Sequence, residues 1–433
     1  MNTERIEILY GKGTTPVDVP VENLVKVLRV KPWPGLAEPE AAVERALQEP
    51  IGTPPLRDIA KGKKNAVVVI SDVTRPVPNS IILPPILKAL ENSGIPRNAI
   101  LILIGTGMHR PNEGQELVGL VGEKIAGAYR IENHRGTELS DHVDLGVSDE
   151  GVPLLVDRKY YEADLKITTG LIEPHLMAGY SGGRKSVVPG VCSLETMKVL
   201  HGFKMIQHEL ASVGRLDDNP FHLTALRHAR EIGVDFIVNV TVNGKREMTG
   251  VFAGDLDQAH RAGVRELDRY VVDEVDEPVD VVVTGSGGAP LDQTFYQCVK
   301  GMVAGKDVLK KGGTIVFASH LAGGLGSASF RELVEELTTP EAMLESLKGP
   351  DYRKLDQWML QDLCNVLLHA GEVMVYSEHM APDLLRKALV HPIPSLNEGL
   401  HRALENHGRE SARVAVMPQG PYVIARVAEA VGA

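Results

Sequence analysis

Short apolar runs alternate with stretches of helical periodicity along the first part of the chain. Ala66–Ile70 is apolar at every position, which is typical of a strand that is covered on both faces. Ile81–Leu90 has helical spacing and ends near Gly94, and Ile100–Ile104 is a second continuous apolar run. The order strand, helix, strand predicts a βαβ unit, and therefore parallel strands in a layered α/β fold.

Three more strands extend this pattern. Asp164–Thr168 predicts one of them, and Phe236–Val240 and Glu247–Val251 predict two that are joined by a hairpin turn at Asn243-Gly244. Leu256–Tyr270 then has the periodicity of a helix. Layered α/β folds bind ligands at the carboxyl ends of their strands or between domains, so reactive residues at these ends are the candidates for a site.

An acidic segment, Asp273–Pro278, separates this part from a second α/β pattern. A charged run that ends in proline is a common linker composition, although an exposed loop fits it as well. We place a domain boundary there, which gives two layered α/β domains of residues 1–272 and 273–433. The predicted strands of the second domain are Val279–Thr284, Thr314–Ala318, Val373–Tyr376 and Arg413–Val416, and its predicted helices are Gln293–Ala304, Phe330–Leu337, Tyr352–Ala370 and Asn397–Asn406.

Composition and charge exclude several function classes. The length of 433 residues favours two domains, and 46 Lys and Arg against 57 Asp and Glu give a net charge of −11. This acidity argues against a broad nucleic-acid or anionic-membrane surface, and aromatic residues, at 4%, are few for base stacking. The three cysteines are too few for a disulfide framework and favour a reducing cytoplasm. Because no apolar stretch reaches the ~20 residues of a membrane helix, we expect a cytoplasmic protein with no membrane or nucleic-acid partner.

Asp72 and Arg75 lie in a proline-stiffened turn directly after the first predicted strand. The arginine offers two parallel donors that match a carboxylate or a phosphate. A local Asp–Arg pair, with Asn79 capping the next helix, explains the same residues equally well.

His109 follows the strand that ends at Ile104, in a turn that contains Gly105 and Gly107. The glycines allow a ligand to approach the backbone closely, and the histidine lies at the carboxyl end of the strand. A structural or solvent-facing histidine is the alternative. The third glycine of a GxGxxG fingerprint is missing, so support for a dinucleotide site is weak.

The segment Gly170–Gly190 combines five glycines with His175, Arg184 and Lys185. Glycine-rich backbone next to cations is how proteins bind anions. The P-loop pattern fails, because Arg184 separates Gly183 from the lysine that should follow it directly. So many turn residues and cations would be costly in a loop without a function, and we expect an anion site here.

His201 lies at the end of a short predicted helix that Ser193 can cap and Gly202 can end. The helix dipole stabilises a histidine in the last turn, which is an ordinary structural role. Imidazole is also the commonest metal ligand, so both interpretations stay open.

In the second domain, the loop Gly285–Asp292 leads into a predicted helix with a polar face. Tyr296 and Lys300 are four positions apart and share this face, with Gln293 near it and Gln297 beside it. Such a face can cover an anion, whereas a solvated helix face explains the same pattern.

In order and spacing, these segments resemble the nickel-dependent lactate racemase family. The resemblance runs through almost the whole chain, and its most specific part is Glu-Pro-His-x-x-Ala-Gly-x-Ser-Gly-Gly-Arg-Lys at residues 173–185. It implies two α/β domains with the active site in the cleft between them. The other matching segments are Ser71–Arg75, Gly105–His109, Thr196–His201 and Tyr296–Lys300.

The resemblance also implies a cofactor. The family uses a mononucleotide of the pyridinium-3,5-dithiocarboxylic type, the nickel pincer nucleotide, in which two thiocarbonyl groups hold nickel through sulfur, carbon and sulfur. Lys185 matches the lysine that tethers this cofactor through a thioamide, and His201 matches the protein's nickel ligand. His109 and His175 match the two acid/base histidines.

Further residues match polar and aromatic contacts of the family's active site. Asp72 and Arg75 lie where the family has a polar network around cofactor and substrate, and Arg75 would hold the substrate carboxylate. The second-domain residues that match cofactor contacts are Tyr296, Gln297 and Trp358, and those that match substrate contacts are Tyr296 and Lys300.

The implied reaction is inversion at C2 of a 2-hydroxy acid, lactate or a related one, by a hydride relay. One histidine removes the hydroxyl proton while hydride leaves C2 for the cofactor, and hydride then returns to the other face, so two bases are needed. The implied partners are this small acid and the accessory proteins that make the cofactor. Two alternatives stay open: a nucleotide- or anion-binding protein of the same fold without racemase activity, and a P-loop nucleotidase, against which the broken spacing argues.

Overall fold

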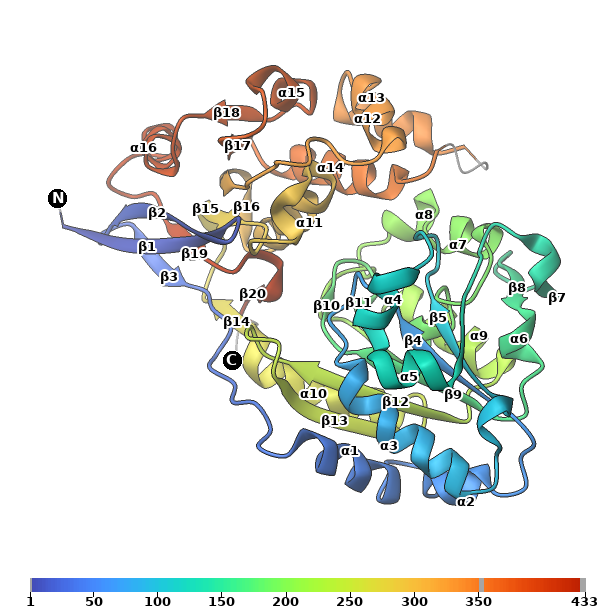
Figure 1. The fold of residues 1–433 in the computed structure, drawn as a ribbon. Helices are drawn as coiled ribbons and strands as arrows, with labels where there is room; N and C mark the ends of the chain where they lie inside the picture. The colour runs from blue at the N-terminus through green and yellow to red at the C-terminus, as the bar shows by residue number, and fades with distance from the viewer. Residues whose placement is uncertain (1, 350–353, 429–433) are drawn as a thin grey trace, which may run out of the picture. The chain divides into compact units, whose positions relative to one another are not determined.

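Two six-stranded sheets form the framework of the structure, one in each of two units (Figure 1). The computed structural model describes residues 2–349 and 354–428. The central unit holds residues 32–201 and 208–269, and the terminal unit holds the described residues of 1–31, 202–207 and 270–433. Both units have the α/β architecture that the alternation of apolar runs and helical segments predicts.

The sheet of the central unit reverses its direction of growth at one strand. Its members are β4 (Ala66–Ser71), β5 (Ile100–Gly105), β6 (Arg130–Asn133), β9 (Lys166–Leu171), β12 (Phe236–Val242) and β13 (Met248–Gly254). Their order is β13-β12-β9-β4-β5-β6, and all neighbours are parallel except the pair β12 and β13. The chain thus runs from β4 outwards to β6 and returns on the other side of β4 with β9. Such a reversal opens a crevice at the carboxyl ends of the strands.

Helices and two small strand pairs complete the central unit. The helices are α1 (Pro39–Gln48), α2 (Leu56–Ala60), α3 (Asn79–Asn92), α4 (Gly114–Val121), α5 (Glu123–Ala128), α6 (Arg158–Tyr161), α7 (Leu194–Leu200), α9 (Pro220–Ile232) and α10 (Gln258–Val271). The strand pairs are β7 (His142–Val147) with β8 (Pro153–Asp157) and β10 (Pro174–His175) with β11 (Gly179–Tyr180). Apolar side chains of α1 to α5 form one continuous core with those of β4, β5, β9 and β12.

The predicted elements of this unit are confirmed within a few residues. The helix expected at Ile81–Leu90 is α3, and the hairpin expected around Asn243-Gly244 joins β12 to β13 in antiparallel register. Helices α1, α4 and α9 and the edge strand β6 have no counterpart in the sequence prediction. Strand β6 is only four residues long and partly exposed, so it lacks the continuous apolar run that marks β4 and β5.

The sheet of the terminal unit is parallel throughout and begins with the N-terminal part of the chain. Its strands are β3 (Leu24–Val27), β15 (Val279–Gly285), β16 (Leu309–Ala318), β17 (Glu372–Tyr376), β18 (His391–Ile393) and β19 (Val414–Met417). Their order is β18-β17-β16-β15-β19-β3. The helices of this unit are α8 (Phe203–Ile206), α11 (Phe295–Lys306), α12 (Ala328–Glu335), α13 (Pro340–Leu347), α14 (Gln357–His369), α15 (Pro382–Lys387) and α16 (Leu396–Asn406).

Residues 2–31 belong to the unit of this second sheet, whereas the boundary expected from the sequence places them with the residues up to 272. Strands β1 (Thr3–Tyr10) and β2 (Gly13–Pro20) form an antiparallel hairpin. The apolar face of the hairpin, with Ile6, Ile8 and Val17, is buried against side chains of β15, β16 and β17. Burial of this apolar face holds the hairpin on the sheet.

The acidic segment after α10 is not a linker along its whole length. Its first half forms β14 (Val272–Val275), which pairs in parallel with β20 (Ile424–Val427), and Asp273 forms a 2.7 Å ion pair with Lys26. The chain passes from the central to the terminal unit just before it, at residues 269 and 270.

The helix expected at Tyr352–Ala370 is α14, and positions 352 and 353 lie outside the described residues. No helix in the described ranges is long and apolar enough to span a bilayer.

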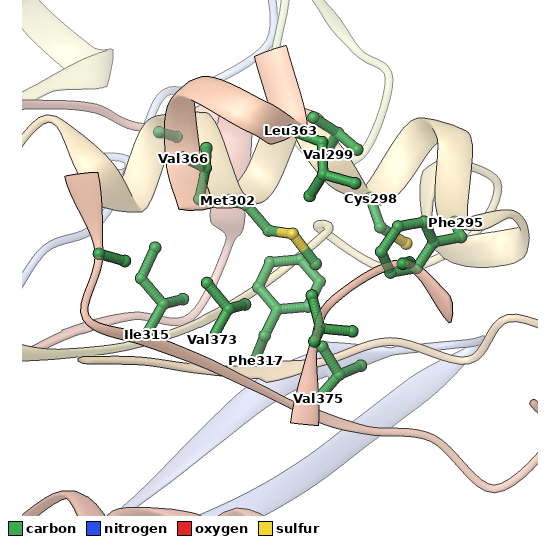
Figure 2. Packing of buried hydrophobic residues seen from close by; sticks show 14 of the residues in the cluster. Phe295, Cys298, Val299, Met302, Ile315, Phe317, Leu363, Val366, Val373 and Val375 are labelled. Atoms are coloured by element: carbon green, nitrogen blue, oxygen red, sulfur yellow. The ribbon is translucent and has the colours of Figure 1, made fainter. Parts of the chain in front are cut away.

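Apolar side chains of α11 and α14 pack on β16 and β17 (Figure 2). Phe317 of β16 is fully buried among Met302 of α11, Val366 of α14 and Val375 of β17. Because such cores are packed as densely as crystals of small organic molecules, loss of a large ring leaves a cavity.

We expect Phe317→Ala to lower the free energy of unfolding of the terminal unit by about 3–5 kcal/mol, and Phe317→Leu to lower it by about 1 kcal/mol. Urea unfolding followed by circular dichroism measures both. Leu368→Ala is the matched control, since Leu368 of α14 is 38% exposed and such a change shifts stability by only about 0.5 kcal/mol. Equal effects of the three substitutions would contradict this account of the core.

Candidate active site

A pocket lies at the carboxyl ends of β9, β4 and β5, where the central sheet reverses direction. Ser71 and Gly105, the last residues of β4 and β5, are directly paired, so the loops that follow them begin at the same level. The third wall comes from the glycine-rich segment after β9. The lining residues include Ser71, Asp72, Thr74, Arg75, Gly105, Thr106, Gly107, His109, Gly170, Leu171, Ser181, Gly182, Lys185, Ser186, Pro189 and Gly190.

Asp72 and His109 form a hydrogen-bonded pair in this pocket. The His109 Nδ1 atom lies 2.6 Å from Asp72 Oδ2, and Thr74 donates to Asp72 Oδ1 through its hydroxyl at 2.5 Å. Burial alone raises the pKa of Asp72, but the hydrogen bonds from His109 and Thr74 outweigh it and lower the pKa below its usual value. Ionised Asp72 accepts a hydrogen bond from the Nδ1–H of His109, so the neutral imidazole carries its lone pair on Nε2.

Arg75 pairs with Glu173 and not with Asp72. Arg75 Nε lies 3.2 Å from Glu173 Oε1, and both side chains are partly exposed. Asn79 does not cap α3, because Pro78 holds the cap position and no side-chain hydrogen bond forms there. The purely local interpretation of this turn is therefore wrong on both points.

Two glycines fix the loop that precedes Lys185. Gly182 has φ 75° and ψ −173°, and Gly183 has φ 53°. A Cβ atom at Gly182 would lie 2.9 Å from Asn239 Oδ1, and one at Gly183 would lie 2.8 Å from His260 Cγ. Only glycine fits a backbone pressed this closely between β12 and α10. The following 3-10 turn, Gly183–Ser186, places Lys185 in the wall of the pocket.

Lys185 and His201 contact the same aromatic ring. Lys185 Nζ lies 4.8 Å from the centroid of Phe221, and the His201 ring lies edge-on to it at 5.6 Å. Phe221 is fully buried in α9. Sequence reasoning missed Phe221, since a phenylalanine in an amphipathic helix gives no signal beyond that of a core residue.

His201 is oriented and neutral. Its Nδ1 donates to the carbonyl of Met197 at 3.1 Å, which leaves the ring's lone pair on Nε2. Burial and the positive charge of Lys185 lower the pKa of His201 to about 3. A neutral imidazole of fixed tautomer is the form in which histidine binds metals.

The predicted site residues fall into three groups. Asp72, Arg75, His109 and Lys185 line one pocket, as expected from their places after parallel strands. His201 and His175 belong to the same unit but do not line that pocket in its described part. His175 lies on β10, and its Nδ1 accepts from the backbone N–H groups of Met177 and Ala178 at 3.4 and 3.3 Å.

The third group lies in the terminal unit. Trp358, in the first turn of α14, donates its indole N–H to Tyr296 Oη of α11 at 3.0 Å, so the fold brings these two residues together. Gln297 Oε1 is buried without a hydrogen-bond partner in the described structure, and Lys300 lies one turn further along α11. Burial raises the pKa of Tyr296 well above its ordinary value, so this hydroxyl stays protonated.

Within residues 2–349 and 354–428, no three His, Cys, Asp or Glu side chains converge as they would around a metal ion. The free cysteines Cys192, Cys298 and Cys364 are all buried. Burial raises the pKa of the Cys192 thiol above its ordinary range, which disfavours the thiolate that metals bind.

Two family models match the chain. The lactate racemase N-terminal domain matches residues 10–214, and the lactate racemase C-terminal domain matches residues 274–425. The chain belongs to the lactate racemase family. It is therefore an isomerase of the racemase type.

Individual relatives agree with this assignment. The lactate racemase of Thermoanaerobacterium thermosaccharolyticum is 34% identical over 426 residues, 97% of this chain and 99% of its own length. That of Lactiplantibacillus plantarum is 35% identical over 428 residues, with the same coverage. The structure of the T. thermosaccharolyticum lactate racemase apoprotein matches 98% of this chain and 100% of its own with a TM-score of 0.92 at 33% identity. A Thermotoga maritima protein shares the fold, with a TM-score of 0.66 at 18% identity over 90% of this chain and 99% of its own.

The Asp72–His109 pair predicts a pH-dependent loss of stability. Because the pKa of Asp72 is lowered in the folded state, its contribution is present above the unfolded pKa of about 4 and is lost as the pH falls through the folded pKa. We expect Asp72→Asn to cost about 1–2 kcal/mol at pH 7 and much less at pH 3. Urea titrations at both pH values measure this, and a cost that does not shrink in acid would contradict it.

Proposed function

We propose that this isomerase interconverts the enantiomers of a 2-hydroxy acid, lactate or a related one, with a nickel pincer nucleotide tethered to Lys185. The observation that carries the proposal is the single pocket that joins Asp72, Arg75, His109 and Lys185. Membership of the lactate racemase family, and two relatives that are themselves lactate racemases, support the same reaction.

The residues present fit this cofactor. Lys185 lines the pocket on a loop that is held in place by the close packing of Gly182 and Gly183 against Asn239 and His260, so the position of its amine is well defined. Neutral His201, with its lone pair on Nε2, suits a single nitrogen ligand to nickel, while the cofactor brings the sulfur ligands. This division of donors agrees with a chain in which no group of three potential ligands converges among the described residues. When bound, the cofactor supplies a reversible acceptor of hydride from C2.

Arg75 binds the substrate carboxylate in this proposal. Its guanidinium already holds one carboxylate, that of Glu173, through Nε, and its terminal nitrogens offer the parallel donors that a second carboxylate needs. Fixing the carboxylate leaves the C2 hydroxyl to be directed at a base. Glu173, the first residue of the motif at 173–185, is a further functional candidate through this contact with Arg75.

His109 moves the hydroxyl proton on one face of the substrate. Its Nε2 carries the lone pair that accepts the proton, and ionised Asp72 on Nδ1 stabilises the imidazolium that forms. His175 serves the other enantiomer, because inversion needs a proton donor and a proton acceptor on opposite faces.

In the terminal unit, we assign Tyr296 and Lys300 to substrate binding, and Tyr296, Gln297 and Trp358 to cofactor binding. We assign the protein to the cytoplasm, with the accessory proteins that make the cofactor as partners.

We expect His109→Gln and His175→Gln each to lower kcat/KM for racemisation by about 10²–10⁴-fold, because each removes a general acid/base. The cofactor-loaded enzyme is incubated with single enantiomers of lactate and of other 2-hydroxy acids, and chirality is followed over time. The equilibrium constant is one, so both directions must fall equally. His208→Gln, at an exposed histidine of the same unit, is the matched control. Full activity of both variants with cofactor bound would refute the assignment of the bases.

Lys185→Ala should remove the covalent cofactor, since the amine that forms the thioamide is gone. Intact-protein mass spectrometry after cofactor loading shows the adduct directly. Lys198→Ala, at a lysine of α7 that pairs with Glu195, is the control and should retain the adduct. An adduct of unchanged mass in the Lys185 variant would show that another residue is the tether.

A further inference from the structure

The residue beside Lys185 is a fully buried arginine. The side chain of Arg184 is 1% exposed, and no described carboxylate lies within ion-pair distance of it. Its Nη2 donates to the carbonyl of Ala178 at 2.6 Å and its Nη1 makes a long contact of 3.4 Å with the carbonyl of Gly182. Its Nε has no hydrogen-bond partner. Arg184 is thus held by neutral backbone oxygens.

The side chains packed around Arg184 are also neutral. His260 Nε2 lies 2.8 Å from the carbonyl of Ser181 and must donate to it, so the 3.3 Å approach of Arg184 Nη1 to the same nitrogen is a contact without a hydrogen bond. His222 stacks on His260 at 6.3 Å, and both of its ring nitrogens are buried without partners. Burial and the charge of Arg184 lower the pKa of His260 to about 3 and that of His222 to about 2. Neither ring supplies a charge near neutral pH.

The nearest charges beyond these rings already have partners. Asp257 accepts from Arg261 at 2.7 Å and from Arg230 at 3.1 Å, and Arg261 also pairs with Asp217. This network is close to neutral in itself and compensates Arg184 only weakly. Burial lowers the pKa of Arg184 to about 9, so the guanidinium remains charged at neutral pH.

A buried charge without a counter-ion destabilises a fold, and a neutral side chain of similar size is usually the more stable choice. The position of Arg184 gives a reason to keep it. Its neighbours in the chain, Ser181, Gly182, Lys185 and Ser186, line the pocket, while its own side chain contacts Ala178 and His260. Because Arg184 is buried, an anion bound at these neighbours would be attracted to its charge through protein of low dielectric, with little water to screen it.

We propose that the counter-ion of Arg184 is the anionic ligand of the pocket, a phosphorylated mononucleotide, which Arg184 stabilises across the loop without touching it. Arg184 is accordingly a positioning residue with an electrostatic role. The identity of the anion rests on the proposed function. The buried charge of Arg184, which lacks a carboxylate partner, is a feature of the apoprotein and can be tested without the cofactor.

The test uses the apoprotein and two probes, nicotinic acid mononucleotide and inorganic phosphate. Their affinities are measured by calorimetric titration for the wild type, Arg184→Gln and Arg184→Lys, and stability is measured by urea unfolding without ligand. We expect the wild type and Arg184→Lys to bind the mononucleotide with similar affinity and Arg184→Gln to bind it about tenfold more weakly. We also expect apo Arg184→Gln to be at least as stable as the wild type, because it no longer buries an uncompensated charge.

Arg261→Gln is the matched control. It removes an arginine of the same neighbourhood that has carboxylate partners, so stability should fall while affinity for the mononucleotide stays unchanged. The inference is overturned if Arg184→Gln binds the mononucleotide as tightly as the wild type, if it is less stable than the wild type, or if the wild type binds neither probe. Absence of racemisation in the wild-type holoenzyme would instead overturn the proposed function and leave these binding results standing.

Discussion

The close approach of the Gly182–Gly183 backbone to β12 and α10 is the constraint on which the site depends. A side chain at either glycine would collide with Asn239 or His260, and Asn239 Oδ1 accepts from the N–H of Gly183 at 2.7 Å. The loop is therefore fixed to the sheet and to a helix at once. Because Lys185 follows on the next turn, its position is set by the framework of the unit.

The same region shows how an acidic protein builds a cationic site. The chain has a net charge of −11, yet Arg75 and Lys185 line one pocket and Arg184 is the chain neighbour of Lys185. Burial of Arg184 reduces the screening of its interactions, because little water surrounds this charge. The net charge therefore bears on the outer surface, which repels other anions such as nucleic acid. The chemistry of the site depends instead on a few side chains at the ends of strands.

The sequence predicted the parts of the molecule that depend on local pattern. Strands β4 and β5 are buried on both faces, so their apolar runs are unbroken, and the loops after them contain Asp72, Arg75 and His109. Parallel strands bring such loops together at one edge, which is why these candidates meet in a pocket. The partner of Arg75 was not predictable, since Glu173 is far away in sequence. The place of the β1–β2 hairpin was not predictable either, because alternation in a strand shows that one face is buried but not which sheet covers it.

A metal site with a single protein ligand needs another source of rigidity than a site with four. Four ligands restrain one another through the metal, whereas one histidine must be oriented by its own surroundings. In this chain the carbonyl of Met197 fixes the ring of His201 from one side, and Phe221 supports it from another. Phe221 also lies under Lys185, so the proposed ligand and the proposed tether share one buried ring. A displacement of that ring would move both together, and for this reason precise packing of Phe221 can take the place of additional ligands.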